Sequence, residues 1–92
     1  MWLKLAVITT AYCIHGTTAT GTHTAPGTVA VDPALIPLGS KLYVPGYGGG
    51  TALDTGGLIV GHRADVWFAS CARARQWGVR RVVIRYRTSR RR

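Results

Sequence analysis

The chain has 92 residues, and its 12 Lys and Arg against three Asp and no Glu give a formal net charge of +9. This length allows one domain, and no apolar run approaches the ~18 residues that a membrane-spanning helix needs. The 12 glycines and the hydrophobic fraction of 47% predict a turn-rich, mainly β domain with one small core. Carboxylate chemistry is confined to Asp32, Asp54 and Asp65, because these are its only acidic side chains.

The first half of the chain is expected to form short strands between turns. Residues 2–12 are rich in Leu, Val, Ile, Thr and Tyr and contain no breaker, which favours a strand. Residues 15–27 form a polar Gly/Thr stretch that predicts a loop or short hairpin. Residues 28–31 and 41–44 predict two more strands, and the two prolines between them disfavour a helix there.

Two glycine-rich segments occupy the middle of the chain. Residues 45–50, PGYGGG, predict a turn, and residues 54–57, DTGG, predict a sharp change of backbone direction. Residues 58–60 are apolar and predict a further strand, which Gly61 ends. An apolar segment then follows Asp65.

The last third of the chain predicts the one helix and the last strand. A helix is expected near residues 69–77, with Ser70 as its N-cap and Gly78 as its stop. In residues 81–87 apolar side chains alternate with arginines, as in a half-buried strand. Six strands and one helix are expected in all.

Positive charge gathers towards the C-terminus. Nine of the 12 basic residues lie between Arg73 and Arg92, and residues 89–92 look like a basic tail on a single domain of residues 1–88. The simplest interpretation is a solvated strand face and a basic tail. The alternative is attraction to a polyanion, for which nucleic acid, teichoic acid, acidic lipid and acidic glycan all fit.

The two cysteines, Cys13 and Cys71, are 58 positions apart and form no CxxC pair. In an exported domain they could form a disulfide that stabilises the fold by about 4 kcal/mol, and in the cytosol they would be buried thiols. Residues 1–8 are too short for a signal peptide. Action outside the membrane would therefore need a removed signal, a longer parent chain or another release route.

Each aspartate has a distinctive setting. Asp32 ends the segment VAVDP, Asp54 opens DTGG, and Asp65 precedes the apolar residues 66–68. Apolar surroundings would raise the pKa of Asp65, and a carboxyl that stays protonated can act as a general acid. The alternative is that all three carboxylates are structural, since Asp before Pro or Gly is common turn chemistry.

Eight short motifs follow one another along the chain: TAYC, TATG, VAVDP, IPLGS, GYG, DTGG, G-x-x-x-D and A-x-x-W-G. The series runs from about Val7 to Tyr86 and resembles the three-aspartate (3D) domain of bacterial peptidoglycan lytic transglycosylases. The resemblance implies a six-stranded double-psi β-barrel with one short α-helix. It also implies cleavage of the β-1,4 bond between N-acetylmuramic acid and N-acetylglucosamine, with a 1,6-anhydromuramoyl product and no metal or other cofactor.

The resemblance further implies roles for individual residues. Asp65 matches the acid that protonates the glycosidic oxygen, and it or a neighbour then takes a proton from the muramoyl C6 hydroxyl, which attacks C1. Asp54 would raise the pKa of Asp65 and hold substrate hydroxyls, and Asp32 would shape or line the groove. Further substrate-binding candidates are Thr18, Thr20, Tyr47, Gly56 and Gly57.

By the same resemblance, the partner is the glycan strand of peptidoglycan and not nucleic acid, the location is the cell wall or the exterior, and the protein is a monomer. It also favours a Cys13–Cys71 disulfide. Val60 stands where the family usually has Lys, with His62 or Arg63 as possible substitutes for the missing cation.

Two other classes of function stay open. Asp54-Thr55-Gly56 is also the triplet of aspartic proteases, and a chain with one such triplet would act as a homodimer. Gly57 replaces the usual Ser or Ala after that triplet, and the protease hypothesis leaves the Asp65 segment unexplained. A non-catalytic module would bind wall polymer or nucleic acid through its arginines, with strong salt dependence and indifference to the loss of Asp65.

Overall fold

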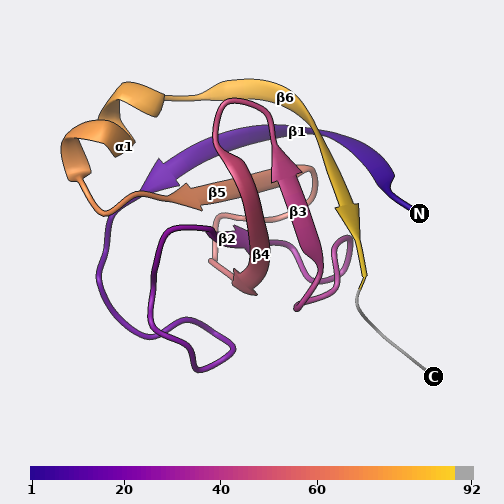
Figure 1. Cartoon of the computed structure of the whole chain (residues 1–92), viewed down its shortest axis with the longest axis horizontal. Coiled ribbons are helices and arrows are strands. Elements are labelled where there is room, and N and C mark those ends of the chain that lie inside the picture. Colours follow the sequence, from indigo (N-terminus) through magenta and orange to yellow (C-terminus); the bar gives the residue numbers. More distant parts are fainter. Residues whose placement is uncertain (89–92) are drawn as a thin grey trace.

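Six strands close into a barrel in the order β1-β5-β2-β4-β3-β6 in the computed structural model, which describes residues 1–88 (Figure 1). The strands are β1 (Leu3–Tyr12), β2 (Thr28–Val31), β3 (Lys41–Val44), β4 (Gly48–Asp54), β5 (Arg63–Trp67) and β6 (Arg80–Arg87). The pairs β1–β5 and β2–β4 are parallel, and the other four pairs are antiparallel. This closed, mainly β arrangement is consistent with a double-psi β-barrel.

The barrel interior is filled by side chains that alternate along each strand. The buried aliphatic residues that meet there include Val7, Val29, Val31, Leu42, Val44, Val66 and Ile84. The alternation predicted for the last strand is confirmed, since Ile84 is buried while Arg85 and Arg87 are exposed. Strands such as β3 and β6 therefore have one core face and one outer face, whereas β2 is buried at all four positions.

The expected strand at residues 58–60 is wrong. The segment lies in the loop between β4 and β5, where Leu58 is 84% and Val60 is 64% exposed and only Ile59 is buried. Three consecutive apolar residues followed by a glycine predicted a strand, but among the described residues no strand pairs with them.

The sequence pattern did not predict strand β4, which begins at Gly48 within the segment expected to be a turn. Its glycines pair with the apolar strand β3. A Cβ at Gly50 would lie 2.6 Å from the carbonyl oxygen of Gly27. The backbones approach too closely for any side chain at that position, so β4 requires glycine at Gly50 despite the low β-propensity of that residue.

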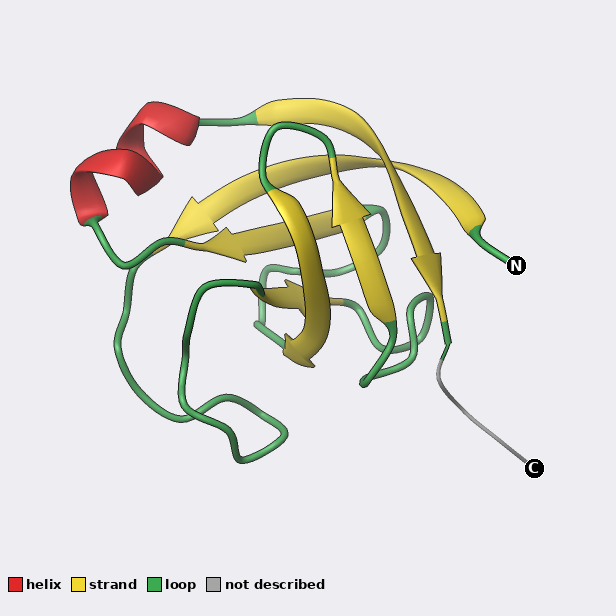
Figure 2. Ribbon diagram, in the orientation of Figure 1, coloured by secondary structure: helices red, strands yellow, loops and turns green. Residues whose placement is uncertain are grey.

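The helix α1 (Cys71–Trp77) is confirmed at the end of β5 (Figure 2). The Ser70 side chain accepts a hydrogen bond from the Arg73 N–H, and Gly78 ends the helix at a φ of 65°. Trp77 is buried, and its Nε1 donates to the hydroxyl of Thr9 over 3.1 Å. Within residues 1–88 no helix is long and apolar enough to cross a membrane. The expected basic tail, residues 89–92, lies outside the described residues.

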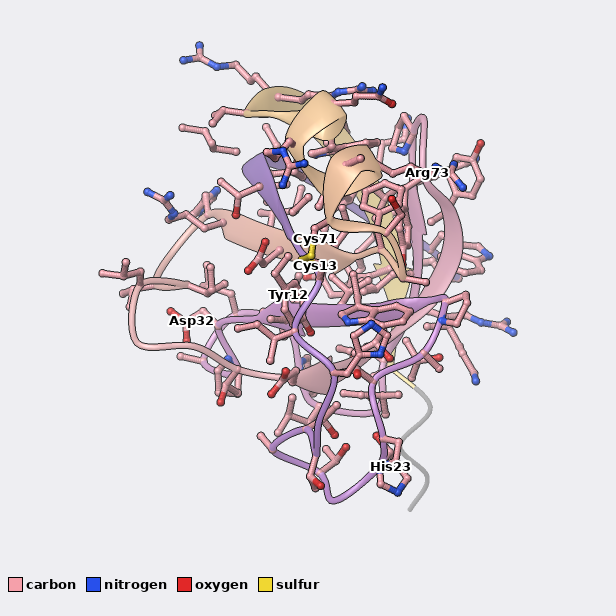
Figure 3. The ribbon with its side chains drawn as sticks, turned by 90° about the vertical axis from the view of Figure 1, so that its left-hand side faces the viewer. Tyr12, Cys13, His23, Asp32, Cys71 and Arg73 are labelled. Atoms are coloured by element: carbon pink, nitrogen blue, oxygen red, sulfur yellow. A yellow bond between two sulfur atoms is a disulfide. The ribbon has the colours of Figure 1, made fainter. Side chains whose placement is uncertain are left out.

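The disulfide between Cys13 and Cys71 is confirmed, with the two Cα atoms 5.1 Å apart. It joins the residue after β1 to the first residue of α1, directly beside Tyr12 (Figure 3). The bond therefore fixes the start of the long loop of residues 13–27 against the segment that follows β5.

Candidate active site

Two aspartates flank Ala30 on three neighbouring strands. Ala30 of β2 pairs with Asp65 of β5 on one side and with Asp54 of β4 on the other. Paired residues direct their side chains to the same face, and two strand spacings separate the outer Cα atoms by about 10 Å. The methyl group of Ala30 leaves the space between the two carboxyl groups open.

A register shift brings Asp54 to this face. Val29 pairs with Ala52, but the next residue, Ala30, pairs with Asp54 and skips Leu53. Ala52 is fully buried in the core, so strict alternation would direct Asp54 into the barrel interior as well. The bulge adds one residue to β4 and turns the carboxyl outward, as bulges beside functional sites do.

Both carboxyl groups line one cavity of about 210 Å³ on the outer face of the barrel. The cavity lining comprises Tyr12, Ile14, Gly16, Thr17, Thr24, Ala30, Asp54, Thr55, Gly56, Ile59 and Asp65. Four of these residues belong to the loop of residues 13–27. That loop forms a wall over the strands, and the apolar members of the lining limit the access of water to the carboxyls.

Asp54 accepts three hydrogen bonds. Its Oδ2 accepts from the Tyr12 hydroxyl over 3.1 Å. Its Oδ1 accepts from the backbone N–H groups of Ala19 and Thr55, over 3.0 and 2.9 Å. Donors therefore hold both oxygens of this carboxylate in place, and burial together with the neighbouring Asp54 charge raises the pKa of Tyr12 so that its phenol stays protonated.

Asp65 has a different environment. Burial raises its pKa above the ordinary range, and the charge of Asp54 adds to this effect. The Thr10 hydroxyl, which donates to Oδ1 over 2.9 Å, and the cation of Arg63 act in the opposite direction without reversing the shift. The pair thus contains one carboxyl biased towards its protonated form beside one that acts as an acceptor.

The sequence attributed a raised pKa of Asp65 to burial among the apolar residues that follow it, and burial is the main cause, although Val66 itself does not contribute to it. Val66 faces the barrel core and so lies on the other side of the strand. Around the carboxyl, the apolar lining comes from distant segments, with Ile14 in the loop after β1 and Ile59 in the loop before β5.

This shift predicts a pH dependence of stability. The folded pKa of Asp65 lies above the ordinary value of about 3.9, so the folded state retains a proton that the unfolded chain has lost. The protonated Asp65 carboxyl therefore contributes to folding stability fully below pH ~3.9, and this contribution is lost as pH rises through the folded pKa. Asp65→Asn should remove this pH-dependent loss of stability. Relative to the parent, the variant should therefore be stabilised more at pH 7 than at pH 4. Thermal unfolding of both proteins from about pH 3.5 to about pH 8 measures the difference, and parallel curves would contradict it.

Asp32 lies outside this cavity, and its carboxylate binds the backbone. Oδ1 accepts from the Ala34 N–H over 2.9 Å and Oδ2 accepts from the Gly61 N–H over 2.7 Å. These hydrogen bonds lower its pKa and tie the end of β2 to the loop that carries Ile59. The structure therefore gives Asp32 an indirect connection to the cavity wall.

The two threonines of TATG hold the loop rather than facing the cavity. The Thr18 hydroxyl is buried and shares hydrogen bonds with the hydroxyls of Thr20 and Thr22. The Thr20 hydroxyl and N–H both bond to the carbonyl of Leu53. Their shared effect is to place the Ala19 N–H against Asp54. Hydrogen bonds from the two threonines to the glycan stay a prediction.

The other substrate-binding candidates divide between two places. Gly56 lines the aspartate cavity, where an added Cβ would lie 3.1 Å from the Ile59 side chain, and Gly57 is exposed outside the lining. Tyr47 lines a separate cavity of about 360 Å³ with Phe68 and Arg73. Its hydroxyl donates to the Trp67 carbonyl over 2.6 Å, so sugar stacking on its ring remains a prediction for that second cavity.

Sequence reasoning missed the residues that contact or separate the two carboxyls, Thr10, Tyr12 and Ala30. Tyr12 and Thr10 stand two residues apart in TAYC, which is the spacing that directs both side chains of a strand to one face. That signal was present, but nothing in the sequence showed that β1 would pair with β5 at Asp65.

Comparison with known proteins gives two findings. Residues 27–86 match the family described as the 3D domain. The chain is 46% identical over 91 residues to "Cell wall-binding protein YocH" of Bacillus subtilis (strain 168) and 41% identical over 91 residues to "Putative cell wall shaping protein YabE" of the same organism. These alignments cover 89% and 88% of this chain but only 32% and 22% of the two relatives, so the chain spans a third or less of their length.

Proposed function

Because this chain belongs to the 3D domain family, we propose that it is a peptidoglycan lytic transglycosylase that cleaves the bond between N-acetylmuramic acid and N-acetylglucosamine. The observation that carries the proposal is the pair of carboxyls in one outer cavity, Asp65 with a raised pKa and Asp54 fixed as an acceptor. A carboxyl with a raised pKa beside a carboxyl whose oxygens are held by hydrogen-bond donors is an arrangement suited to general acid catalysis.

In the proposed reaction Asp65 is the general acid. Its proton passes to the glycosidic oxygen as the bond from that oxygen to C1 of the muramoyl residue breaks. The muramoyl C6 oxygen forms a new bond to C1, and its proton passes to the Asp65 carboxylate, which restores the acid. No water is consumed, so the anhydro product is one water lighter than a hydrolysis product.

The internal hydroxyl explains why a small site suffices. A nucleophile on the same sugar has a large effective concentration, so the protein need not supply a carboxylate nucleophile or position a water. Asp54 then stabilises the positive charge that develops at C1 and holds a substrate hydroxyl. Asp32, through the Gly61 N–H, fixes the loop that closes one side of the cavity.

The proposed location is the cell wall or the exterior of the cell. The names of the two relatives refer to cell wall binding and cell wall shaping, and the disulfide is typical of an oxidising environment. Peptidoglycan glycan strands are the proposed partner.

The dimeric aspartic protease hypothesis is less well supported. That mechanism needs Asp54 beside its copy from a second chain, so that two like carboxyls share one proton. Asp54 instead shares a cavity with Asp65 of its own chain, and its two oxygens already accept three hydrogen bonds.

The direct test is incubation of the protein with purified peptidoglycan, followed by mass analysis of the soluble products. Release of anhydromuropeptides is the expected result. Products heavier by one water would indicate hydrolysis, and an absence of soluble products from sacculi that a known lytic transglycosylase digests would contradict the proposal.

Tyr12 gives a second test of the same site. Tyr12→Phe removes the hydroxyl that donates to Asp54 but keeps the ring in the cavity wall. We expect a rate lowered by about tenfold, because a charge-assisted hydrogen bond contributes about 1.5 kcal/mol or more. Initial rates on sacculi measure the effect, with KM and kcat separated. Tyr43→Phe is the matched control, because it makes the same chemical change at an exposed tyrosine on β3 that does not line the aspartate cavity. Equal rates for Tyr12→Phe and the parent would contradict the assigned contact.

A further inference from the structure

A second, larger groove lies on the outer face of the barrel, formed by strands β3, β4 and β6. Its volume is about 580 Å³. The residues that line it include Trp2, His23, Lys41, Gly49, Thr51 and Arg87, and none of the three aspartates is among them. The groove is therefore a cationic surface apart from the aspartate cavity.

Two cations of the groove stand directly opposite each other. Lys41 of β3 pairs with Arg87 of β6, and both side chains are exposed and line the groove. Like charges at opposed positions of an antiparallel pair are destabilising. The next outer-face position of β6, Arg85, pairs with Lys4 of β1, so four cations lie on three adjacent strands. This arrangement costs stability in the free protein and is relieved when an anion binds between the charges.

Aromatic rings hold two of these cations in position. The Arg87 guanidinium lies 5.1 Å from the ring centroid of Trp2, and the Arg85 guanidinium lies 5.2 Å from that of Tyr43. Both rings are exposed, by 43% and 41%. Such rings restrict the guanidinium positions and offer flat faces for sugar rings.

Three glycines contribute bare backbone to the lining of the groove, Gly27, Gly49 and Gly50. A Cβ built at Gly49 meets no atom within 4 Å and its φ is outside the left-handed region, so neither strain nor crowding requires glycine there. Its neighbour Gly50 is glycine for the close contact with Gly27 described above. The absence of a side chain at Gly49 keeps the groove open for an extended chain.

We infer that this groove binds an anionic polymer of the cell wall, one that carries a charged group at each sugar-containing or polyol repeat. The inference rests on the proposed function in taking the wall as the surroundings. The exposed cations without carboxylate partners among the lining residues favour a polyanion, and the aromatic rings favour a repeat with a sugar. Nucleic acid is disfavoured because the disulfide places the domain in an oxidising environment.

The loop between the two sites connects them. Thr24 lines the aspartate cavity, while its neighbours His23 and Ala25 line the cationic groove. One short segment is thus a wall of both sites. Polymer bound in the groove would hold the aspartate cavity at the wall surface, where glycan strands are concentrated.

The test measures binding of the parent, Lys41→Gln and Arg87→Gln to intact sacculi and to sacculi stripped of their anionic polymers. Arg75→Gln is the matched control, because it removes the same charge from an exposed position on α1, at the other end of the barrel from the start of β1 (Figure 1). We expect each groove variant to bind intact sacculi about fivefold more weakly, the effect of one cation near an anionic surface, with a shallower salt dependence. Arg75→Gln should bind as the parent does, and stripped sacculi should bind all four proteins weakly and alike.

Three outcomes would overturn the inference. The first is equal parental binding to intact and stripped sacculi, and the second is an equal loss of binding in Arg75→Gln. The third is tighter binding of the parent to duplex DNA than to intact sacculi at the same salt concentration, with the same loss in Lys41→Gln. Thermal unfolding checks the variants, and Lys41→Gln should be at least as stable as the parent since it relieves a repulsion. Release of anhydromuropeptides from stripped sacculi is measured separately. If the catalytic proposal fails in that assay, the binding comparison still tests the groove.

Discussion

Asp65→Asn is expected to lower the rate of anhydromuropeptide release by roughly 100-fold or more, with the fold intact. Asn has the shape of Asp and can still accept the hydrogen bond from the Thr10 hydroxyl, but it has no proton to give to the glycosidic oxygen. Burial raises the pKa of Asp65 because it destabilises the charged carboxylate. The neutral Asn side chain does not carry this cost. A variant that is inactive yet more stable at neutral pH would therefore separate catalysis from folding, because a merely structural carboxylate would lose both together.

The measurement combines mass analysis of products from sacculi with thermal unfolding of each protein. Asp54→Asn is the informative companion, because its Oδ1 can keep the Ala19 and Thr55 hydrogen bonds while the negative charge is lost. It should also impair turnover, and it should shift the fall of activity at high pH to lower pH, because a nearby negative charge no longer raises the pKa of Asp65. If Asp65→Asn released product at the parental rate, Asp54 would become the leading candidate for the acid.

Loss of the disulfide should have the largest effect on stability. The Cys13–Cys71 bond closes a loop of 58 residues, and its removal should cost about 4 kcal/mol in the chain-entropy account. For a domain of this size the melting temperature should fall by roughly 20 °C. The loop wall of the aspartate cavity should loosen as well, because Cys13 directly follows Tyr12, which contacts Asp54.

The double variant Cys13→Ser/Cys71→Ser supplies the control for this prediction. Reductant should lower the melting temperature of the parent to that of the variant and leave the variant unchanged. A parental melting temperature indifferent to reductant, with free thiols demonstrated by mass, would show that the crosslink contributes nothing.

Local sequence patterns were sufficient to predict several elements of this fold. The alternation of Ile84 with Arg85 and Arg87 set the two faces of β6, and Ser70 and Gly78 set the ends of α1. These features were predictable because they depend on side chains a few positions apart, whose relative directions follow from the strand or helix repeat itself. The family resemblance added the barrel and the expectation of a disulfide, which residue patterns had left open.

The sequence by itself determined that the carboxyl chemistry lies with Asp32, Asp54 and Asp65, but only the tertiary structure decided which of them meet. The Val29/Ala30 bulge turns Asp54 outward, the pairing of Ala30 with Asp65 brings the second carboxyl beside it, and Asp32 binds backbone elsewhere. Strand register is set by contacts between segments that are distant in sequence, and a shift of one residue reverses the face of a side chain. Strand formation likewise depends on which backbone lies alongside a segment. Residues 58–60 have the apolar pattern of a strand but no strand partner within residues 1–88, whereas the glycines of β4 lack that pattern but pair with β3.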